Sequence, residues 1–262
     1  MRKHFIVVVA FFLCAIASLG QGVKEVGPQK SFGSQNTFAP FFASAPAVVQ
    51  PTTGNPILDT CTNYATHVTC AYPINVTSGN EAYVFIATSG TSVIATPTCS
   101  SGTATIGTFT AVGAGSSAGG QQQWYRAAIT GSGSCTVSET ITGGTSQYVG
   151  VFPFEVSNDG GVDSGTNPVY NSVSCFGPTT CNNVSITTST ANDLLLYVFM
   201  GGSTAVYSAL TPYSVATNVN NPGGNQLSFL SGSYVSSTAT TVGGTYTVSN
   251  TVNPWNSVIA IK

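Results

Sequence analysis

The fold of this chain is decided by a stretch of sequence that occurs twice. The first copy reads Asn80-Glu81-Ala82-Tyr83-Val84-Phe85-Ile86, and the second reads Asn192-Asp193-Leu194-Leu195-Leu196-Tyr197-Val198-Phe199. In both copies an amide and a carboxylate, which favour turns, precede aliphatic and aromatic residues, which favour a β-strand. The second run stays apolar through Met200 and is too short for a typical helix. It therefore predicts a central strand covered on both faces, or a strand packed under the N-terminal segment.

The sequence that follows each copy also matches, in the same order. In each copy a strand that begins with glutamine is followed by a Gly-Gly pair. The first copy has Gln122-Gln123-Trp124-Tyr125 and Gly143-Gly144, and the second has Gln226-Leu227-Ser228-Phe229 and Gly243-Gly244. Tyr148-Val149-Gly150-Val151 then corresponds to Trp255-Asn256-Ser257-Val258-Ile259. Any two antiparallel meanders share some of these features, but the shared order favours an internal duplication. We expect halves at about 78–157 and 190–262, with strands that intercalate around one core.

From residue 58 onward, short runs of Val, Ile, Tyr, Phe and Thr alternate with Gly, Ser, Asn and Pro, as in β-sandwiches and barrels. Apolar and hydroxyl residues alternate in Thr136-Val137-Ser138 and Tyr246-Thr247-Val248, which indicates half-buried strands. No segment shows a sustained helical period. The predicted strands are 68–76, 82–88, 92–98, 105–112, 122–129, 135–141, 147–156, 184–188, 194–200, 213–218, 226–235, 240–248 and 255–261.

These patterns predict an all-β fold for residues 58–262. We expect one two-sheet antiparallel β-sandwich of the jelly-roll-like kind, built from two related halves and stapled by disulfides.

The N-terminus has the features of an export signal. Arg2 and Lys3 precede an apolar run from Phe5 to Ala17, and Ala15-Ile16-Ala17 is a cleavage motif. The alternative is a retained membrane anchor, but the run is short and small residues follow it. We therefore expect a signal peptide at 1–20, a secreted or cell-surface protein, and no membrane insertion after cleavage. Residues 21–57, rich in Pro, Gly, Gln and Ser, predict an extended or disordered leader.

The chain carries very little charge. Asp, Glu, Lys and Arg make up 5% of the sequence, against about 25% in typical domains. Loss of Arg2 and Lys3 with the signal leaves four basic residues against eight acidic ones, a formal net charge of −4. Four scattered cations cannot form a basic patch, so no nucleic-acid partner is expected.

Six cysteines remain after signal cleavage, and an even number in an exported chain indicates disulfides. Six cysteines allow 15 pairings. Short intervening loops favour the nearest-neighbour pairs Cys61–Cys70, Cys99–Cys135 and Cys175–Cys181. A metal site is the weaker alternative, because no C-x2-C pair is present and His67 is the only histidine outside the signal.

Catalytic groups are scarce, and no enzyme is expected. His67 is the only candidate base for a nucleophile, and no G-x-S-x-G motif occurs. A glycoside hydrolase needs two carboxylates about 5–10 Å apart. Glu155 is expected to point inward, but without an obvious second carboxylate. The other acids considered are Asp59, Glu81, Glu139, Asp159, Asp163 and Asp193, of which Glu81 and Asp193 fit turns.

One loop and a few aromatic residues are the candidate ligand sites. Asp159, Asp163 and Asn167 lie in a Gly-rich loop whose oxygens suit calcium, although a polar turn between the repeats explains them as well. No other cofactor is expected. Trp124 and Tyr125 point to opposite faces of a strand, so one ring is expected to be exposed for sugar stacking. Tyr207 and Tyr213 near loops are further candidates.

Segments along most of the chain resemble a known group. The segments that carry the resemblance are Trp124-Tyr125-Arg126, Cys135-Thr136-Val137-Ser138, Phe154-Glu155-Val156-Ser157, Gly161-Val162-Asp163, Asn167-Pro168-Val169, Thr187 to Leu195 and the closing Trp255 to Lys262. Over about 78–262 they resemble uncharacterised bacterial secreted jelly-roll-like β-sandwich domains. The resemblance implies a sandwich at the cell surface or outside the cell, and it assigns no catalytic residue. The chain departs from the pattern by a longer linker at 157–163 and an extra loop between Cys175 and Cys181.

We expect a secreted, non-catalytic binding or adhesion module whose partner is an extracellular glycan or a cell-surface polymer. The alternative is a self-assembling surface or filament subunit, because few charges protect the strand edges. Self-association would then run through the leader, whose aromatic residues could dock in a neighbouring copy. These residues are Phe32, Phe38, Phe41 and Phe42, and the apolar pair Val48-Val49 is part of the same docking segment. A glycoside hydrolase is less favoured than either.

Overall fold

The computed structural model describes residues 44–50, 61–62, 67–89, 93–117, 120–143, 148–164, 168–171, 175, 179–182, 184–202, 206–220, 227–249 and 254–262. Within these residues all regular secondary structure is β, and every strand pair is antiparallel. Residues 42–262 form one compact unit. None of the described residues belongs to a helix long and apolar enough to cross a membrane.

The first half of the chain forms a large sheet and a small one, which we name sheets A and B. Sheet A has the order β1 (Ala47–Gln50), β11 (Tyr148–Ser157), β4 (Glu81–Ser89), β9 (Gly120–Gly131) and β7 (Thr105–Ile106), with β2 (Cys61–Thr62) on β11 and β8 (Thr110–Ser116) on β9. Sheet B has β3 (His67–Val76) and β5 (Val93–Ile94) on either side of β10 (Gly133–Thr142), and β6 (Thr98–Gly102) also on β10.

The second half repeats this arrangement as sheets C and D. Sheet C has the order β12 (Val169–Asn171), β21 (Pro254–Ile261), β15 (Asp193–Gly202), β18 (Leu227–Ser236) and β17 (Ser214–Asn220). Sheet D has the order β13 (Thr179–Asn182), β20 (Thr245–Val248) and β16 (Tyr207–Thr211), and the pair β14 (Ile186–Thr187) and β19 (Thr241–Val242) lies beside it.

The strand orders confirm that the protein is built from two related halves. β1-β11-β4-β9-β8 in sheet A corresponds to β12-β21-β15-β18-β17 in sheet C. The two stretches that are alike in sequence become β4 and β15, which occupy the same central position in their sheets. The predicted all-β, antiparallel, disulfide-stapled sandwich is therefore confirmed.

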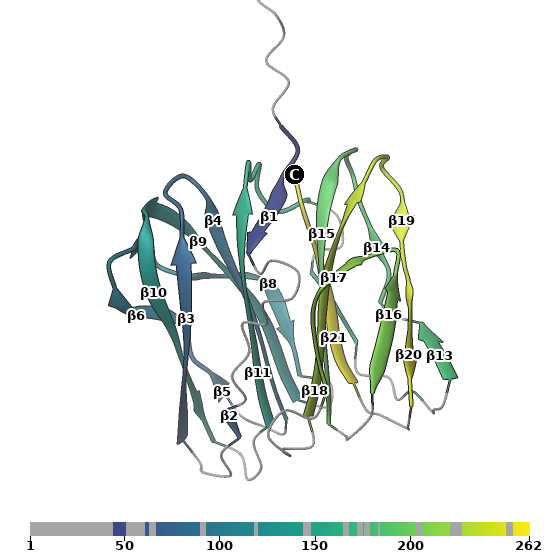
Figure 1. Ribbon diagram of the computed structural model, residues 1–262, viewed down its shortest axis with the longest axis horizontal. Helices are drawn as coiled ribbons and strands as arrows, with labels where there is room; N and C mark the ends of the chain where they lie inside the picture. Colours follow the sequence, from purple (N-terminus) through teal and green to yellow (C-terminus); the bar gives the residue numbers. More distant parts are fainter. Residues whose placement is uncertain are drawn as a thin grey trace, which may run out of the picture. The chain divides into compact units, whose positions relative to one another are not determined.

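The halves do not intercalate, which differs from the expectation of one shared core. Four sheets stack in the order B, A, C, D (Figure 1), and three separate hydrophobic clusters lie between them. The physical reason is that both faces of the central strands are apolar. Leu194 to Met200 in β15 are at most 2% exposed, with even-numbered residues facing sheet A and odd-numbered residues facing sheet D.

Sheets A and C meet in a seam made of large side chains. Phe85 packs against Trp124 with ring centroids 5.2 Å apart, and Phe152 from sheet A meets Phe229 from sheet C at 5.7 Å. The Trp124 indole N–H donates a hydrogen bond to the Ser257 hydroxyl across the seam at 2.8 Å. Burial of such rings supplies about 1.5–3 kcal/mol each.

Gly150 in β11 lets the two sheets approach closely. A Cβ atom built there would lie 2.5 Å from Met200 Sδ and 3.0 Å from Phe229 Cε1, which is too close for ordinary contact. The seam therefore requires glycine at this position.

We expect Gly150→Val to destabilise the protein by about 1–3 kcal/mol through overpacking. Urea unfolding measures the change in the free energy of unfolding. Gly107→Val is the matched control, because a Cβ at Gly107 meets its nearest atom, Ala128 O, at an ordinary 3.5 Å. Equal losses in the two variants would contradict a tight seam at Gly150.

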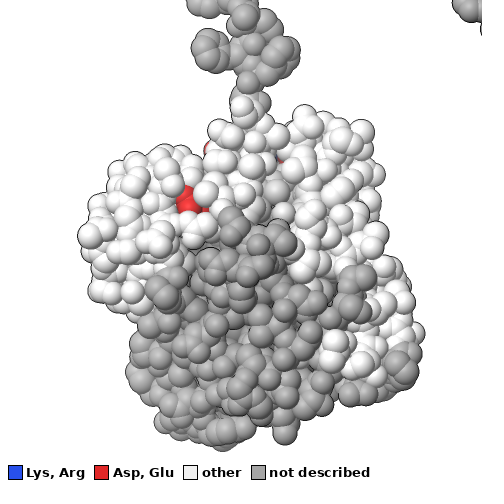
Figure 2. Space-filling model, in the orientation of Figure 1, with Lys and Arg blue, Asp and Glu red and all other residues white. Residues whose placement is uncertain are grey.

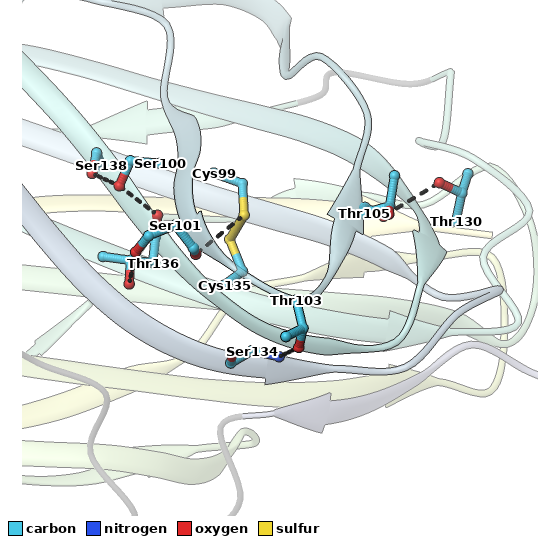
Figure 3. The surroundings of a disulfide bond; sticks show 10 residues. All are labelled: Cys99, Ser100, Ser101, Thr103, Thr105, Thr130, Ser134, Cys135, Thr136 and Ser138. Atoms are coloured by element: carbon cyan, nitrogen blue, oxygen red, sulfur yellow. Dashed lines mark hydrogen bonds between the residues drawn. A yellow bond between two sulfur atoms is a disulfide. The ribbon is translucent and has the colours of Figure 1, made fainter.

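Two disulfides staple the outer parts of the molecule. Cys99 in β6 bonds Cys135 in β10, as Figure 3 shows, and Cys175 bonds Cys181. These confirm two of the three predicted pairs. The side chains of Cys61 and Cys70 lie outside the described residues.

The disulfides should differ in their contribution to stability, because they close loops of 36 and 6 residues. Loop-closure entropy predicts a loss of about 4 kcal/mol when Cys99 and Cys135 are both replaced by Ala, and about 2 kcal/mol for Cys175 and Cys181. Urea unfolding of the two double variants checks the order, and a larger loss from the short loop would refute it.

Candidate functional site

A cleft of about 400 Å³ opens in the first half, between strand β5 of sheet B and strands β8 and β9 of sheet A. This volume lies within the range of small-ligand sites. The lining residues are uncharged, and most carry an amide or a hydroxyl group. They are Val93, Ile94, Gly115, Ser116, Ser117, Gln121, Gln122, Gln123 and Tyr125.

Strand β9 supplies one wall through its alternation. Tyr125 belongs to the cluster between sheets A and B, and Gln121 and Gln123 lie on the same face of the strand because they are two and four residues before it. Trp124, one residue away, faces the opposite side. The wall therefore presents two amides and a phenol ring to the cleft.

A bulge in β8 fixes the Gln123 side chain. Its register against β9 shifts between Val112 and Ser116. Gln123 Nε2 donates to the carbonyls of Val112 at 3.1 Å and Trp124 at 2.8 Å. A Cβ at Gly115 would lie 2.5 Å from Gln123 Oε1, so glycine leaves room for that oxygen beside the cleft. Both hydrogen bonds of the Gln123 amide nitrogen thus go to backbone carbonyls, and the amide oxygen lies beside Gly115.

Glu139 is buried close to this cleft. It alternates with Val137 and Ile141 on the inner face of β10, and Ile141 pairs with the cleft residue Ile94. Its exposed fraction is 1%, and within the described residues no hydrogen bond of ordinary geometry reaches its carboxyl oxygens, although the backbone of Thr140 and Ala95 lies near enough to act on them. Burial raises the pKa of Glu139 to about 9, and the nearby backbone of Thr140 and Ala95 opposes the rise only in part. At neutral pH this carboxyl is therefore protonated.

Glu139 lies close enough to Tyr125 to influence the pKa of the phenol. Burial raises the pKa of Tyr125 to about 12, and the charge of Glu139 adds to the rise. The phenol is therefore neutral throughout the physiological range, and the cleft presents no charge of its own.

Glu139 was considered in the sequence only as one of several scattered acids. The signal that identifies it is the alternation Cys135-Thr136-Val137-Ser138-Glu139-Thr140-Ile141, in which the glutamate occupies an inward-facing position. The same alternation predicts the strand correctly, so the buried carboxyl could have been inferred from it.

The predicted sugar-stacking aromatics are mostly buried. Trp124 has an exposed fraction of 0% in the seam, so the expectation that it offers a ring to ligands is wrong. Tyr213 is 5% exposed and packs on Tyr197 in the core between sheets C and D. The side chain of Tyr207 lies outside the described residues. Tyr125, itself 5% exposed, is the predicted aromatic that lines the cleft.

The two carboxylates proposed for calcium lie in different networks. Asp159 accepts hydrogen bonds from the Tyr83 hydroxyl and the Gly161 N–H, both at 3.0 Å, and pairs with Arg126 at 3.2 Å. Arg126 also pairs with Glu81 at 3.0 Å. Asp159 is thus already neutralised by a cation.

Asp163 is held instead by the second half of the chain. It accepts hydrogen bonds from the backbone N–H and the hydroxyl of Ser189, and its Oδ1 lies 3.5 Å from Lys262 Nζ. Asn167 lies outside the described residues. No group of three or more His, Cys, Asp or Glu side chains that could hold a metal ion occurs in the part of the chain that the structure describes.

Asp163 and Asp193 lie close enough for each to shift the pKa of the other. Burial raises the pKa of Asp163, but the donors of Ser189 outweigh it and hold that pKa below its usual value. Burial also raises the pKa of Asp193; the Thr190 hydroxyl opposes this, and the charge of Asp163 adds to it. The pKa values of the two neighbouring carboxyls therefore shift in opposite directions.

Glu155 is buried, as expected, but its carboxyl oxygens already accept three hydrogen bonds. It accepts hydrogen bonds from Gln50 Nε2 at 2.7 Å, from the Thr77 backbone N–H at 2.8 Å and from Asn80 Nδ2 at 2.5 Å. The bond from Gln50 fastens β1, the strand within the predicted leader, to β11, and the other two hold the turn at 77–80 against the same carboxyl. The side chain of His67 and the whole of Asp59 lie outside the described residues.

No protein-family model, curated protein or solved structure matches this chain. The resemblance to bacterial secreted sandwich domains stays a prediction. Figure 2 shows a face on which almost all described atoms belong to uncharged residues, in keeping with the composition.

Glu139 should make the stability of the protein fall as pH rises. The pKa of the Glu139 carboxyl is near 4.5 in the unfolded chain and about 9 in the folded protein. Between these two pH values the folded state holds a proton that the unfolded state has lost. This lowers stability by up to about 1.4 kcal/mol per pH unit. Glu139→Gln removes that contribution, so we expect the variant to become increasingly more stable than the wild type from pH 5 to pH 9. Urea unfolding at several pH values tests this, and parallel pH profiles would rule it out.

Proposed function

We propose that this protein is a secreted, non-catalytic binding module that holds a carbohydrate-type ligand in the cleft between β5, β8 and β9. The observation that carries the proposal is the cleft itself, about 400 Å³ in volume and lined by amide, hydroxyl and aliphatic groups without charge.

Several properties of the cleft suit a polyhydroxylated ligand. Sugar hydroxyls both donate and accept hydrogen bonds, and the Gln and Ser side chains of the lining complement them. Val93, Ile94 and the Tyr125 ring offer apolar contact for the C–H faces of a sugar. Val93 is 63% exposed, so one rim of the cleft is open to an entering ligand.

A non-catalytic role is supported by the state of the carboxylates. Glu81, Asp159 and Asp163 are ion-paired, and Glu155 is bound by three donors. The disulfides favour an oxidising, extracellular setting, where glycans are abundant partners.

A variant that fills the cleft tests this function. Ser117 lines the cleft and is exposed, so Ser117→Trp should block the site without disturbing a core. We expect the wild type to bind members of a broad glycan array and Ser117→Trp to bind them at least about tenfold more weakly.

Ala239→Trp is the matched control, because Ala239 is exposed on a turn of the second half, far along the chain from the cleft residues. Trp124→Ala is unsuitable as a probe of binding, because it would leave a cavity between sheets A and C and so destabilise the protein. A wild type that binds no glycan, or two Trp variants that bind equally well, would argue against the cleft as a glycan site.

A further inference from the structure

Gln123 holds a polar group in a fixed orientation on the wall of the cleft. Its Nε2 donates to the carbonyl oxygens of Val112 at 3.1 Å and Trp124 at 2.8 Å. A primary amide has two N–H groups, and these two bonds use both of them. The reverse orientation of the amide would place Oε1 against two carbonyl oxygens, which cannot donate. The fold therefore leaves Gln123 only an acceptor, its Oε1, to offer a ligand.

The glycine at position 115 makes room for that acceptor. Gly115 and Gln123 both line the cleft, and a Cβ atom on residue 115 would lie 2.5 Å from Gln123 Oε1. The amide oxygen thus occupies the space that a side chain at 115 would fill. Because Gly115 is exposed and Gln123 is half-buried, a ligand in the cleft can approach this oxygen.

The cleft holds no charge that could pair with an acidic ligand. None of its lining residues is a cation. Among the described residues the basic ones are Arg126 and Lys262, and both are ion-paired with carboxylates that do not line the cleft. A carboxylate or sulfate group bound there would lose its water without gaining a positive partner, which is costly.

We propose that the cleft selects neutral sugars over acidic ones, and that Gln123 determines this specificity by accepting a hydrogen bond from a ligand hydroxyl. This inference rests on the proposed function and names the ligand class of the same cleft. A sugar hydroxyl can donate to Oε1, whereas an ionised carboxylate has no proton to donate and is repelled by the lone pairs of an acceptor. The lining hydroxyl of Ser117 both donates and accepts, so it complements the other hydroxyls of a neutral sugar.

Matched pairs of oligosaccharides test the ligand class. Each neutral oligomer that binds in a broad glycan array is compared, by isothermal titration, with its uronic acid counterpart of the same linkage and length, in which C6 is oxidised to a carboxylate. We expect the acidic member of each pair to bind at least about tenfold more weakly to the wild type.

The outcomes separate this inference from the proposed function. If acidic members bind as tightly as neutral ones, or if charged glycans alone bind, the preference for neutral sugars is overturned and glycan binding stands. Binding to no glycan at all removes both proposals.

Ser117→Arg supplies the missing cation and tests the cause of the preference. Ser117 lines the cleft and is exposed, so the guanidinium can reach a ligand without being buried itself. We expect this variant to bind the acidic oligomer at least about fivefold more tightly than the wild type does. Ala239→Arg is the matched control, because it adds the same charge at an exposed position of the second half. Equal gains in the two variants would contradict the inference.

Gln123→Met removes the acceptor and keeps the length of the side chain. We expect it to bind the best neutral ligand about three- to tenfold more weakly. Among the monodeoxy forms of that ligand, one should show the same loss in the wild type and no further loss in Gln123→Met, which a purely structural effect would not produce. Gln50→Met is the matched control, because Gln50 donates to Glu155 outside the cleft and its loss should leave binding unchanged.

Circular dichroism shows whether each variant is folded. A folded Gln123→Met variant that binds like the wild type would overturn the role of Gln123. If that variant does not fold, the deoxy series in the wild type decides: equal binding of every monodeoxy form would overturn the hydrogen bond, since the cleft would then require no hydroxyl.

Discussion

The rest of the structure depends on the burial of two apolar faces on each large sheet. β4 and β15 carry large side chains on both sides, and neither side can be left in water at this size. The small sheets cover the outer faces, and sheets A and C cover each other. This constraint sets the four-layer order, and it gives a physical reason for the duplication, because one half alone would expose the seam face of its large sheet.

Several of the few charged side chains tie the two halves together. The described part of the linker between the halves, residues 158–164, is bound to both of them. Asp159 is bound by Arg126 of the first half, and Asp163 by Ser189 and Lys262 of the second. Between them, Val162 forms a β-bridge with Ile261. A loop that resembled a calcium site in sequence thus joins the two halves through ion pairs and strand-like backbone contacts.

The sequence was sufficient for most of the long strands, the duplication and two disulfides, because these follow from local alternation and spacing. It missed strands that lie at the edges of the sheets or at the ends of loops, namely β1, β2, β6, β12, β13 and β16. The sequence was insufficient to predict how the sheets stack in layers. Alternation shows that Trp124 and Tyr125 point to opposite faces, but it cannot show that both faces are covered when the cover comes from a distant segment. One of the two rings was therefore expected to be exposed, but both are buried, Trp124 in the seam and Tyr125 between sheets A and B. The cleft could not be predicted, since it depends on a bulge in β8 and on β5 lying opposite β9.

Glu139 and Glu155 show how a chain with so little charge uses its buried acids. Both lie in the first half and both are 1% exposed. Glu155 has three donors and fastens β1, so its burial is explained by the fold. Glu139 has only the nearby backbone of Thr140 and Ala95 to offset its burial, so its pKa rises to about 9 and its presence lowers the stability of the protein as pH rises. Burial alone therefore does not decide what an acid contributes to a fold; the donors that surround it do.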